Sequence, residues 1–258
     1  SGGIFVKYAG HPPISRGERV TISGLTNSGD YAPIVVAPKF LEHHPDTLPH
    51  PVAMTAKAWS GVLDGVLVTA EGVIHSVEGR QNPNHLTFDV YTAFGPVHVV
   101  AAPQFGDMEL LRRIEDSEVR VTGVGGVIFN ARRQLIGLQI DVSKAADIRI
   151  IESGTKDPFQ SSAAPIDSLL RFSPTGRFGH RTRITGTATM IGDGFLYVQD
   201  HTGGTRVDAD AKGLRVGDFV DVVGYPSPEG YSPILKDATV RLRRHDQPLP
   251  AQKITAES

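Results

Sequence analysis

Phe219-Val220-Asp221-Val222-Val223-Gly224 is the stretch that decides the fold, because two other stretches of the chain repeat it. The other copies are Arg19-Val20-Thr21-Ile22-Ser23-Gly24 and Glu118-Val119-Arg120-Val121-Thr122-Gly123. Before the closing glycine, apolar residues share two alternate positions: Val20, Val119 and Val220, then Ile22, Val121 and Val222. A period of two is typical of a strand that buries one face. The sequence therefore predicts a protein built from repeated small β-units.

The first and third copies also agree outside the strand. Tyr31-Ala32-Pro33-Ile34 follows Gly24 at the distance at which Tyr231-Ser232-Pro233-Ile234 follows Gly224. Upstream, the first six residues align with residues 202–207 if the alignment is shifted by one residue. The third copy has two further strands before that point and the first copy has none. We therefore expect an incomplete first unit, whose missing strands come from further upstream or from another source, because an opened barrel leaves unpaired strand edges.

The end of the chain echoes the segment after the first unit. Asp246-Gln247-Pro248-Leu249-Pro250 resembles Asp46-Thr47-Leu48-Pro49-His50, which leads into a new unit. We expect residues 246–258 to begin another linker, with a further unit or domain beyond it.

Composition favours an all-β protein. The chain has 258 residues, 40% of them hydrophobic, with 28 glycines and 18 prolines, which suit many short strands and turns. No apolar window reaches the roughly 18 to 20 residues of a membrane span, and no secretory leader pattern occurs. The net charge of −2 argues against a polyanionic partner. The absence of cysteine excludes disulfides and thiolate chemistry but leaves the compartment open.

The repeats and turn signals divide the chain into units and linkers. We expect an incomplete unit at 1–45, a Pro-rich linker at 46–57, a complete unit at 58–152, a linker with a helical turn at 153–180, a complete unit at 181–245 and the start of the next linker at 246–258. We call 1–45, 58–152 and 181–245 the first, second and third units.

Each complete unit is expected to hold five strands. The predicted strands are 66–77, 85–91, 95–101, 118–124 and 134–142 in the second unit, 181–190, 195–199, 205–208, 219–224 and 235–242 in the third, and 4–7, 19–24 and 33–41 in the first. Helices are predicted at 107–114 and, reduced, at 211–215, between the third and fourth strands. This is the order of an OB-fold. The predicted fold class is all-β, mostly β with one short helix per unit: tandem OB-fold-like five-stranded barrels, the first incomplete.

Several separated phrases resemble a known kind of bacterial region. They are Val198-Gln199-Asp200-His201-Thr202-Gly203-Gly204, Gly217-Asp218-Phe219-Val220, Arg133-Gln134-Leu135-Ile136-Gly137 and Ile166-Asp167-Ser168-Leu169-Leu170-Arg171-Phe172. In this order they resemble the tandem OB-like extracytoplasmic sensory region of bacterial membrane-bound sensor histidine kinases and diguanylate cyclases. The resemblance covers nearly all of the chain. It implies a periplasmic sensor region in a larger protein, and it brings no ligand-binding residues with it.

Catalytic motifs are absent from the sequence. It has no Gly-x-Ser-x-Gly elbow, Ser-x-x-Lys or His-Glu-x-x-His, so we expect no catalytic residues, no enzyme activity in this chain and no cofactor. We interpret Gly203-Gly204 as a turn between strands, capped by Asp200. The histidines, notably His43, His44, His50, His85 and His98, lack the spacing of a zinc site, so no metal site is expected.

Two groups of side chains are candidate binding residues. Arginine forks suit carboxylate, sulfate or phosphate oxygens, and the basic candidates are Arg132, Arg133, Arg171, Arg177, His180 and Arg181, with Arg183 beside them. The alternative is that these arginines pair with acids such as Asp167 and Asp193. Stacking candidates on an open OB face are Tyr91, Phe94 and Tyr197, whereas Phe88 is expected inside the barrel.

The sequence favours a non-catalytic sensory region that binds a small molecule or a protein, within a larger bacterial membrane signalling protein whose adjoining domains are its further partners. Nucleic acid is an unlikely partner on charge grounds, and no membrane span is expected in this chain. The alternatives are an OB-fold single-stranded nucleic-acid-binding protein and a structural spacer array.

Overall fold

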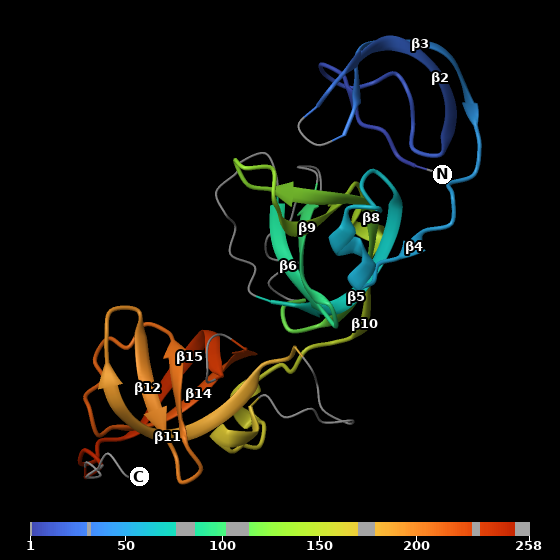
Figure 1. The fold of residues 1–258 in the computed structure, drawn as a ribbon. Coiled ribbons are helices and arrows are strands. Elements are labelled where there is room, and N and C mark those ends of the chain that lie inside the picture. The colour runs from blue at the N-terminus through green and yellow to red at the C-terminus, as the bar shows by residue number, and fades with distance from the viewer. Residues whose placement is uncertain are drawn as a thin grey trace. The chain divides into compact units, whose positions relative to one another are not determined.

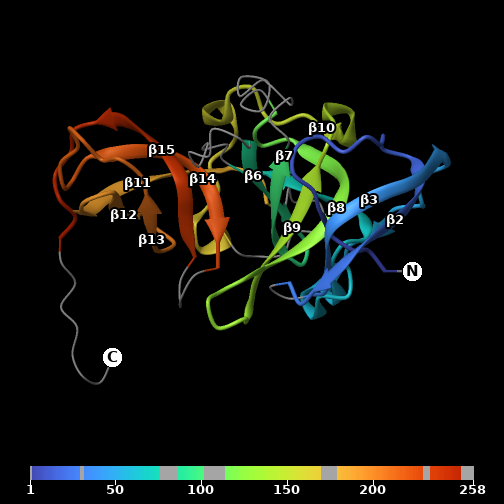
Figure 2. The same ribbon diagram turned by 90° about the horizontal axis from the view of Figure 1, so that it is seen from above.

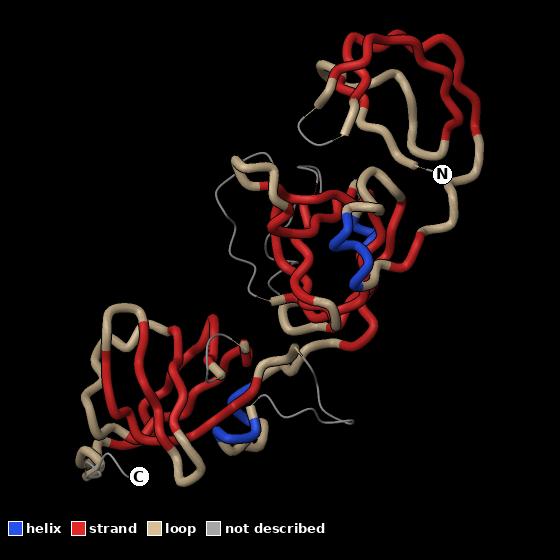
Figure 3. The backbone as a smooth tube through the Cα atoms, in the orientation of Figure 1, coloured by secondary structure: helices blue, strands red, loops and turns tan. Residues whose placement is uncertain are grey.

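The computed structural model describes residues 2–29, 32–75, 86–101, 114–169, 179–228 and 233–250. Contacts divide the chain into two compact bodies, Ser1–Glu152 and Ser153–Ser258. Strands dominate both bodies (Figures 1 and 3). The helices in the described ranges are short 3₁₀ turns: η1 (Ala56–Ser60), η3 (Ala145–Asp147), η4 (Pro158–Gln160) and η5 (Ile166–Ser168). No helix in these ranges is long and apolar enough to span a membrane.

The third unit is a closed five-stranded barrel. Its strands are β11 (Thr182–Ile191), β12 (Phe195–Gln199), β13 (Gly204–Asp208), β14 (Phe219–Ser227) and β15 (Ile234–Arg244). They follow the order β11-β12-β13-β15-β14, and β14 pairs back onto β11 (Figure 2). The pairing of β13 with β15 is parallel and the other pairings are antiparallel. This is the OB-fold order that the sequence predicts.

The second unit repeats this order. Its ring consists of β5 (Leu67–Ile74), β6 (Leu86–Thr92), β7 (Gly95–Ala101), β8 (Glu118–Phe129) and β9 (Leu135–Val142). The β8–β5 pairing closes the ring, and β7 and β9 are the parallel pair. Two short strands, β4 (Val52–Ala53) and β10 (Ile148–Glu152), add to β5 and β8.

The first unit contains three strands, β1 (Val6–Lys7), β2 (Glu18–Asn27) and β3 (Ile34–Pro45). They form an open sheet in the order β1-β3-β2, with β1 parallel to β3. These strands correspond to β13, β14 and β15 of the third unit. The prediction of an incomplete first unit is confirmed, although β3 extends to Pro45, beyond its predicted end at residue 41.

Backbone irregularities recur at the offset of 200 residues. Ala37 and Asp237 both have φ of +47°. The register of β2 with β3 shifts between Ser23 and Leu25, and that of β14 with β15 shifts between Val223 and Tyr225. A β-bulge therefore occupies the same place in both units. At each bulge a glycine meets the partner backbone, because a Cβ on Gly224 would lie 2.9 Å from the Lys236 carbonyl oxygen.

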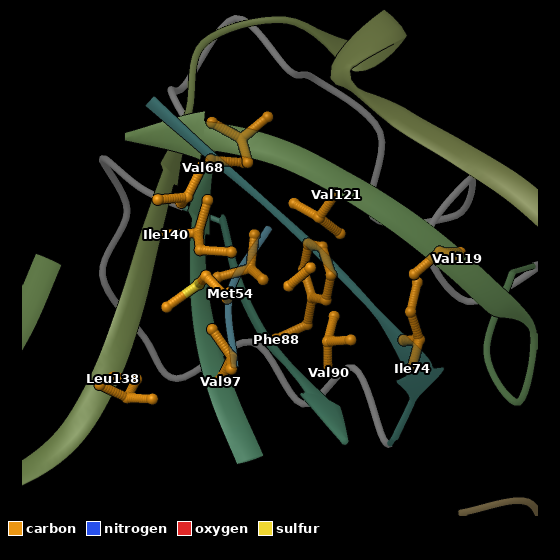
Figure 4. Packing of buried hydrophobic residues seen from close by; sticks show 14 of the residues in the cluster. Met54, Val68, Ile74, Phe88, Val90, Val97, Val119, Val121, Leu138 and Ile140 are labelled. Carbon is orange, nitrogen blue, oxygen red and sulfur yellow. The ribbon is translucent and has the colours of Figure 1, made fainter. Parts of the chain in front are cut away.

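Alternating apolar residues fill both closed barrels. In the second unit the inward side chains of every ring strand meet in one cluster, which includes Phe88 as predicted (Figure 4). The third unit buries the corresponding positions: Ile184, Leu196, Val198, Val207, Val220, Val222 and Leu235 all have an exposed fraction of 0%. The segments before the barrels also contribute, since Met54 joins the second-unit core and Ile166 the third-unit core. The linkers thus do more than space the units.

Three helical predictions have different outcomes. The predicted helix at 211–215 is wrong: residues 212–213 form a turn, in which Gly213 has φ of +83° and Asp210 accepts the Lys212 N–H. A positive φ cannot continue a right-handed helix. The predicted helix at 107–114 lies outside the described residues, apart from Ile114. The helical turn predicted in the linker at 153–180 is present as η5.

The first strand of each closed barrel bends at a glycine to reach two neighbours. Gly186 lies opposite Val220 on β14, and a Cβ there would approach the Gln199 carbonyl oxygen of β12 to 2.5 Å. Gly72 on β5 lies opposite Val119, and its Cβ would overlap the Tyr91 carbonyl oxygen of β6. Barrel closure in both units therefore requires glycine at this position.

We expect Gly186→Ala to destabilise the third unit by about 1–3 kcal/mol, because the added methyl group forces β11 and β12 apart. Gly203→Ala is the control: its Cβ would meet only the Ile166 Cγ2 atom, at 3.9 Å. The measurement is urea unfolding of the full chain, monitored through the amide resonances of β11–β15. Equal unfolding midpoints for the two variants would contradict this role of Gly186.

Candidate ligand-binding face

The described members of the predicted basic group do not lie together in one cluster. Arg132 and Arg133 lie exposed in the turn between β8 and β9, where the Asn130 side chain accepts the Arg132 N–H. Arg171 and Arg177 lie outside the described residues. His180 is buried, and Arg181 places its guanidinium 5.1 Å from the centre of the Tyr225 ring. Both stand at the entry to β11, in a different compact body from Arg132 and Arg133.

Arg183 binds an internal carboxylate. Its terminal nitrogen donates to Asp221 Oδ1 at 2.9 Å and another donates to the Ser161 carbonyl at 2.7 Å. Arg243 lies 2.9 Å from the other oxygen of Asp221, whose side chain is only 4% exposed. The expected alternative, pairing with a nearby acid, holds for Arg183, but the partner is Asp221 of the repeated strand instead of Asp167 or Asp193. Arg183 is therefore paired within the barrel wall and is not a free anion-binding residue.

Two of the three stacking candidates pack internally. The Tyr91 ring is stacked on His75, with centroids 3.6 Å apart and planes at 10°. Phe94 lies in the turn after β6, packs against the second-unit core, and its carbonyl accepts the Trp59 indole N–H at 3.1 Å. Neither ring offers a free platform in this arrangement.

Tyr197 is the stacking candidate that faces outward. It lies on β12 of the third unit, 40% exposed, and the strand register sets it opposite Met190 on β11 and Arg206 on β13. Phe195 precedes it on the same face, with the two rings edge to face at 6.2 Å. We call Met190, Phe195, Tyr197 and Arg206 the β12 face.

A β-bulge puts Met190 on this face. Ala188 pairs with Val198 and Met190 pairs with Tyr197, so Thr189 is the extra residue on β11. Without the bulge, Met190 would alternate to the other side of the strand. Met190 and Arg206 are site residues that sequence reasoning missed. Arg206 could have been found from its position between Thr205 and Val207, which are buried. The residue between two inward residues of a strand points outward.

Arg206 is held in position by two contacts. Its guanidinium carbon lies 4.6 Å from the centre of the Phe195 ring, and its Nε donates to Asp208 Oδ1 at 2.8 Å. A guanidinium has five N–H donors, and the hydrogen bond to Asp208 uses one of them. The β12 face therefore combines an aromatic ring, a thioether and a positioned cation, a set that suits a planar ligand with an acceptor edge.

The turn beside the face is capped by Asp200, as predicted. Its Oδ1 accepts the N–H groups of Thr202 and Gly203 at 2.7 and 3.0 Å and the Thr202 hydroxyl at 2.6 Å. Its Oδ2 accepts the Ile166 N–H at 3.0 Å, which ties η5 to the barrel. Burial raises the pKa of Asp200, but these hydrogen bonds outweigh it and hold the pKa below its ordinary value of 3.8.

Three of the described histidines each lie beside one carboxylate. His43 lies 3.2 Å from Glu18, His98 lies 2.8 Å from Asp89, and His245 lies 2.8 Å from Asp218. In the described part of the chain no three His, Asp or Glu residues gather as a metal site would require. His85 lies outside the described residues.

A cavity of about 570 Å³ lies in the first body, between the linker and the outside of the second barrel. Its lining is mostly apolar and includes Leu48, Leu67 and Val124. Arg16 and Asp141 are the charged side chains of the lining, and Arg16 is paired with Asp147 at 2.6 Å. The cavity thus offers volume for an apolar group, without a set of converging polar groups.

No protein-family model matches the chain, and no curated protein matches it. Among solved structures, the hypothetical protein ygiW from E. coli is 21% identical, covers 32% of this chain and 90% of its own, and has a TM-score of 0.26. A murine DNA-binding protein bound to double-stranded DNA is 9% identical, covers 67% and 97%, and has a TM-score of 0.29. The p204 HINb domain is 11% identical, covers 67% and 95%, and has a TM-score of 0.25. With scores this low, the barrel assignment rests on the strand order and register described above.

Asp200→Ala should destabilise the third unit by about 1–2 kcal/mol near neutral pH, because the turn and η5 lose their acceptor. A carboxylate with a lowered pKa contributes stability above its unfolded value, 3.8, and loses it as the pH falls through the folded value. The difference from wild type should therefore shrink below pH 3.8. Urea unfolding near neutral pH and below pH 3.8 tests this prediction. Asp193→Ala, at an exposed position, is the control. A pH-independent difference would contradict the role of the ionised carboxylate.

Proposed function

We propose that this chain is a non-catalytic binding array of OB-like barrels, in which the β12 face of the third unit receives the ligand. The observation that carries the proposal is the cross-strand row of Met190, Tyr197 and Arg206, exposed on a rigid barrel wall. Cross-strand neighbours on one face are about 5 Å apart, so one planar group can contact all three side chains.

The filled interior supports an external site. The inward residues of β11 to β15 are fully buried against one another, and η5 adds Ile166 to the same core. A closed barrel packed in this way has no room for a ligand inside. Binding therefore takes place on the outer surface or at the loops.

The chemistry of the face favours a particular ligand class. Tyr197 and Met190 offer apolar contact to a ring, and Arg206 offers N–H donors to a carboxylate or phosphate oxygen. Asp208 Oδ1 lies 2.8 Å from Arg206 Nε and holds the guanidinium over the Phe195 ring. Because the side chain is already held in place, it loses less conformational entropy when a ligand binds. An aromatic carboxylate, as a small molecule or as part of a protein segment, satisfies both requirements.

The wider setting that we propose is the sensory region of a larger bacterial membrane signalling protein, of the histidine kinase or diguanylate cyclase type, on the periplasmic side of the membrane. The resemblance of the repeated phrases supports this setting. In it, adjoining domains of the same polypeptide would respond to ligand binding by a shift between conformational populations.

A second candidate is single-stranded nucleic-acid binding, which the pairing of an exposed Tyr197 with Arg206 favours. Stacking of a base on an OB-fold aromatic contributes roughly 1–3 kcal/mol, and a neighbouring arginine can contact a phosphate. The net charge of −2 works against it, since such binding depends on neutralising phosphates.

An NMR titration of the full chain with indole-3-acetate should shift amide resonances of β11, β12 and β13. Tyr197→Ala should weaken that binding roughly five- to a hundredfold, by analogy with stacking energies of about 1–3 kcal/mol. Tyr8→Ala is the matched control, because Tyr8 is 42% exposed on a different unit. No shifts on these strands, or equal affinity for both variants, would contradict the proposed site.

A fluorescein-labelled oligothymidylate tests the second candidate in the same samples. Binding that depends on Tyr197 and weakens linearly with the logarithm of salt concentration would favour nucleic acid. We expect no binding at low salt.

A further inference from the structure

Three arginines surround one buried carboxylate on the outer wall of the third unit. Asp221, on β14, has a side chain that is only 4% exposed. Arg183 of β11 pairs with its Oδ1 atom and Arg243 of β15 with its Oδ2 atom, each at 2.9 Å. Arg241 lies opposite Asp221 in the register of β14 with β15. Three positive charges therefore stand around one negative charge, which leaves a surplus of two.

The surplus charge lies on the two arginines of β15. The Arg183 side chain is 15% exposed, whereas that of Arg243 is 58% exposed, and Arg241 is also exposed. We call Arg241 and Arg243 the β15 pair. Two residues of a strand span about 7 Å, so the two long side chains can reach a single anion. The β15 pair is therefore open to a ligand from solution.

A β-bulge brings Arg243 to this side of the strand. Phe219 pairs with Arg244 and Val220 pairs with Leu242, so Arg243 is the extra residue on β15. A bulge redirects side chains and is often found beside functional sites. Here it allows Arg243 to reach Asp221, next to Arg241, although the two strands differ by one residue in length.

A ring from the preceding linker holds Arg241 in place. The guanidinium carbon lies 3.7 Å from the centre of the Phe159 ring, on η4. The linker is itself fixed, since Asp157 accepts the Phe159 N–H at 3.1 Å and Arg183 donates to the Ser161 carbonyl at 2.7 Å. Among the residues that the structure describes, Arg241 makes no hydrogen bond or ion pair. A positioned guanidinium therefore keeps its five N–H donors for a ligand.

The barrel fold does not require the β15 pair. At the position of Asp221, the second unit has Arg120, which donates to Glu71 of β5 at 2.6 Å. In the first unit, the residues 200 positions before the β15 pair are Leu41 and His43. The fourth and fifth strands still pair in the second unit, and β2 and β3 pair in the first. Strand pairing thus gives no reason for two exposed arginines here.

We propose that the β15 pair binds the phosphoryl group of a small phosphomonoester. Two guanidinium forks match the oxygens of a tetrahedral anion, which they can contact bidentately. A phosphomonoester carries a charge of roughly −1.5 to −2 at pH 7, which balances the surplus of two positive charges. A carboxylate would bring only one negative charge.

An isolated anion fits this site better than an extended anionic surface. Nucleic acids and anionic membranes are bound by wide basic patches, because each neutralised phosphate adds to the affinity. The β15 pair consists of two residues, in a chain whose net charge is −2. The site shares no residue with the β12 face and does not rest on the function proposed for it.

An NMR titration of the full chain with phenyl phosphate, at constant ionic strength, tests the site. We expect saturable shifts of the β15 amides around residue 241 and of the Nε–H resonances of Arg241 and Arg243. Inorganic phosphate should shift the same resonances. Benzoate, which has the ring but a single charge, should bind at least roughly fivefold more weakly.

Matched variants separate a specific contact from a general effect of charge. Arg241→Gln, at an exposed position, should weaken phenyl phosphate binding at least roughly fivefold, and Arg241→Lys should restore only part of the loss because it lacks the fork. Arg244→Gln is the control, since it removes the same charge from a neighbouring side chain that is paired with Asp246 at 3.1 Å. It should leave the affinity within about twofold. None of these variants should change the indole-3-acetate titration.

Any of four results would overturn the proposal. The first is the absence of saturable shifts with phenyl phosphate and inorganic phosphate. The second is equal weakening by Arg241→Gln and Arg244→Gln, which would mean a general charge effect. The third is equal affinity for benzoate. The fourth is binding to phosphatidylglycerol vesicles that depends on Arg241 while phenyl phosphate does not bind, which would make a membrane surface the partner.

Discussion

Pairing of strand edges is the constraint on which the rest of this structure depends. Five strands close into a barrel because the first strand of each complete unit pairs with both the fourth strand and the second strand. The bend that permits this requires Gly72 in the second unit and Gly186 in the third, where a side chain would collide with the neighbouring backbone. Among the described residues the first unit holds three strands, β1, β2 and β3, which form an open sheet.

Closure also determines where function can lie. Because the barrel interiors are packed with aliphatic side chains, chemical specificity must be on the outer wall, in loops or at an open edge. The outer wall of β11 to β13 carries a tyrosine, a methionine and an arginine in register.

Much of the fold could be predicted because repetition is a strong signal: the strand pattern and the incomplete first unit follow from residues that recur at a fixed offset. The Asp200 turn follows from the paired glycines after a strand. The site was harder to predict. Tyr197 could be named from β-alternation, but the bulge at Thr189, which brings Met190 beside it, leaves no mark that a sequence pattern could show. Arg183 was grouped with ligand-binding arginines because its partner, Asp221, is 38 residues away and becomes a neighbour only through barrel closure. The turn at 212–213 replaced a predicted helix because Gly213 adopts a positive φ.

Amide hydrogen exchange of the full chain tests the central claim, that the first unit is an unclosed copy of the third, most directly. In β14 both edges are paired, one with β11 and the other with β15. Amides that point to either edge along residues 219–224 should therefore be protected from exchange. Among the described residues β2 pairs only with β3, so alternate amides of residues 19–24 should exchange rapidly while their neighbours exchange more slowly. Uniform protection along β2, equal to that of β14, would show that this edge is already covered and would contradict the account.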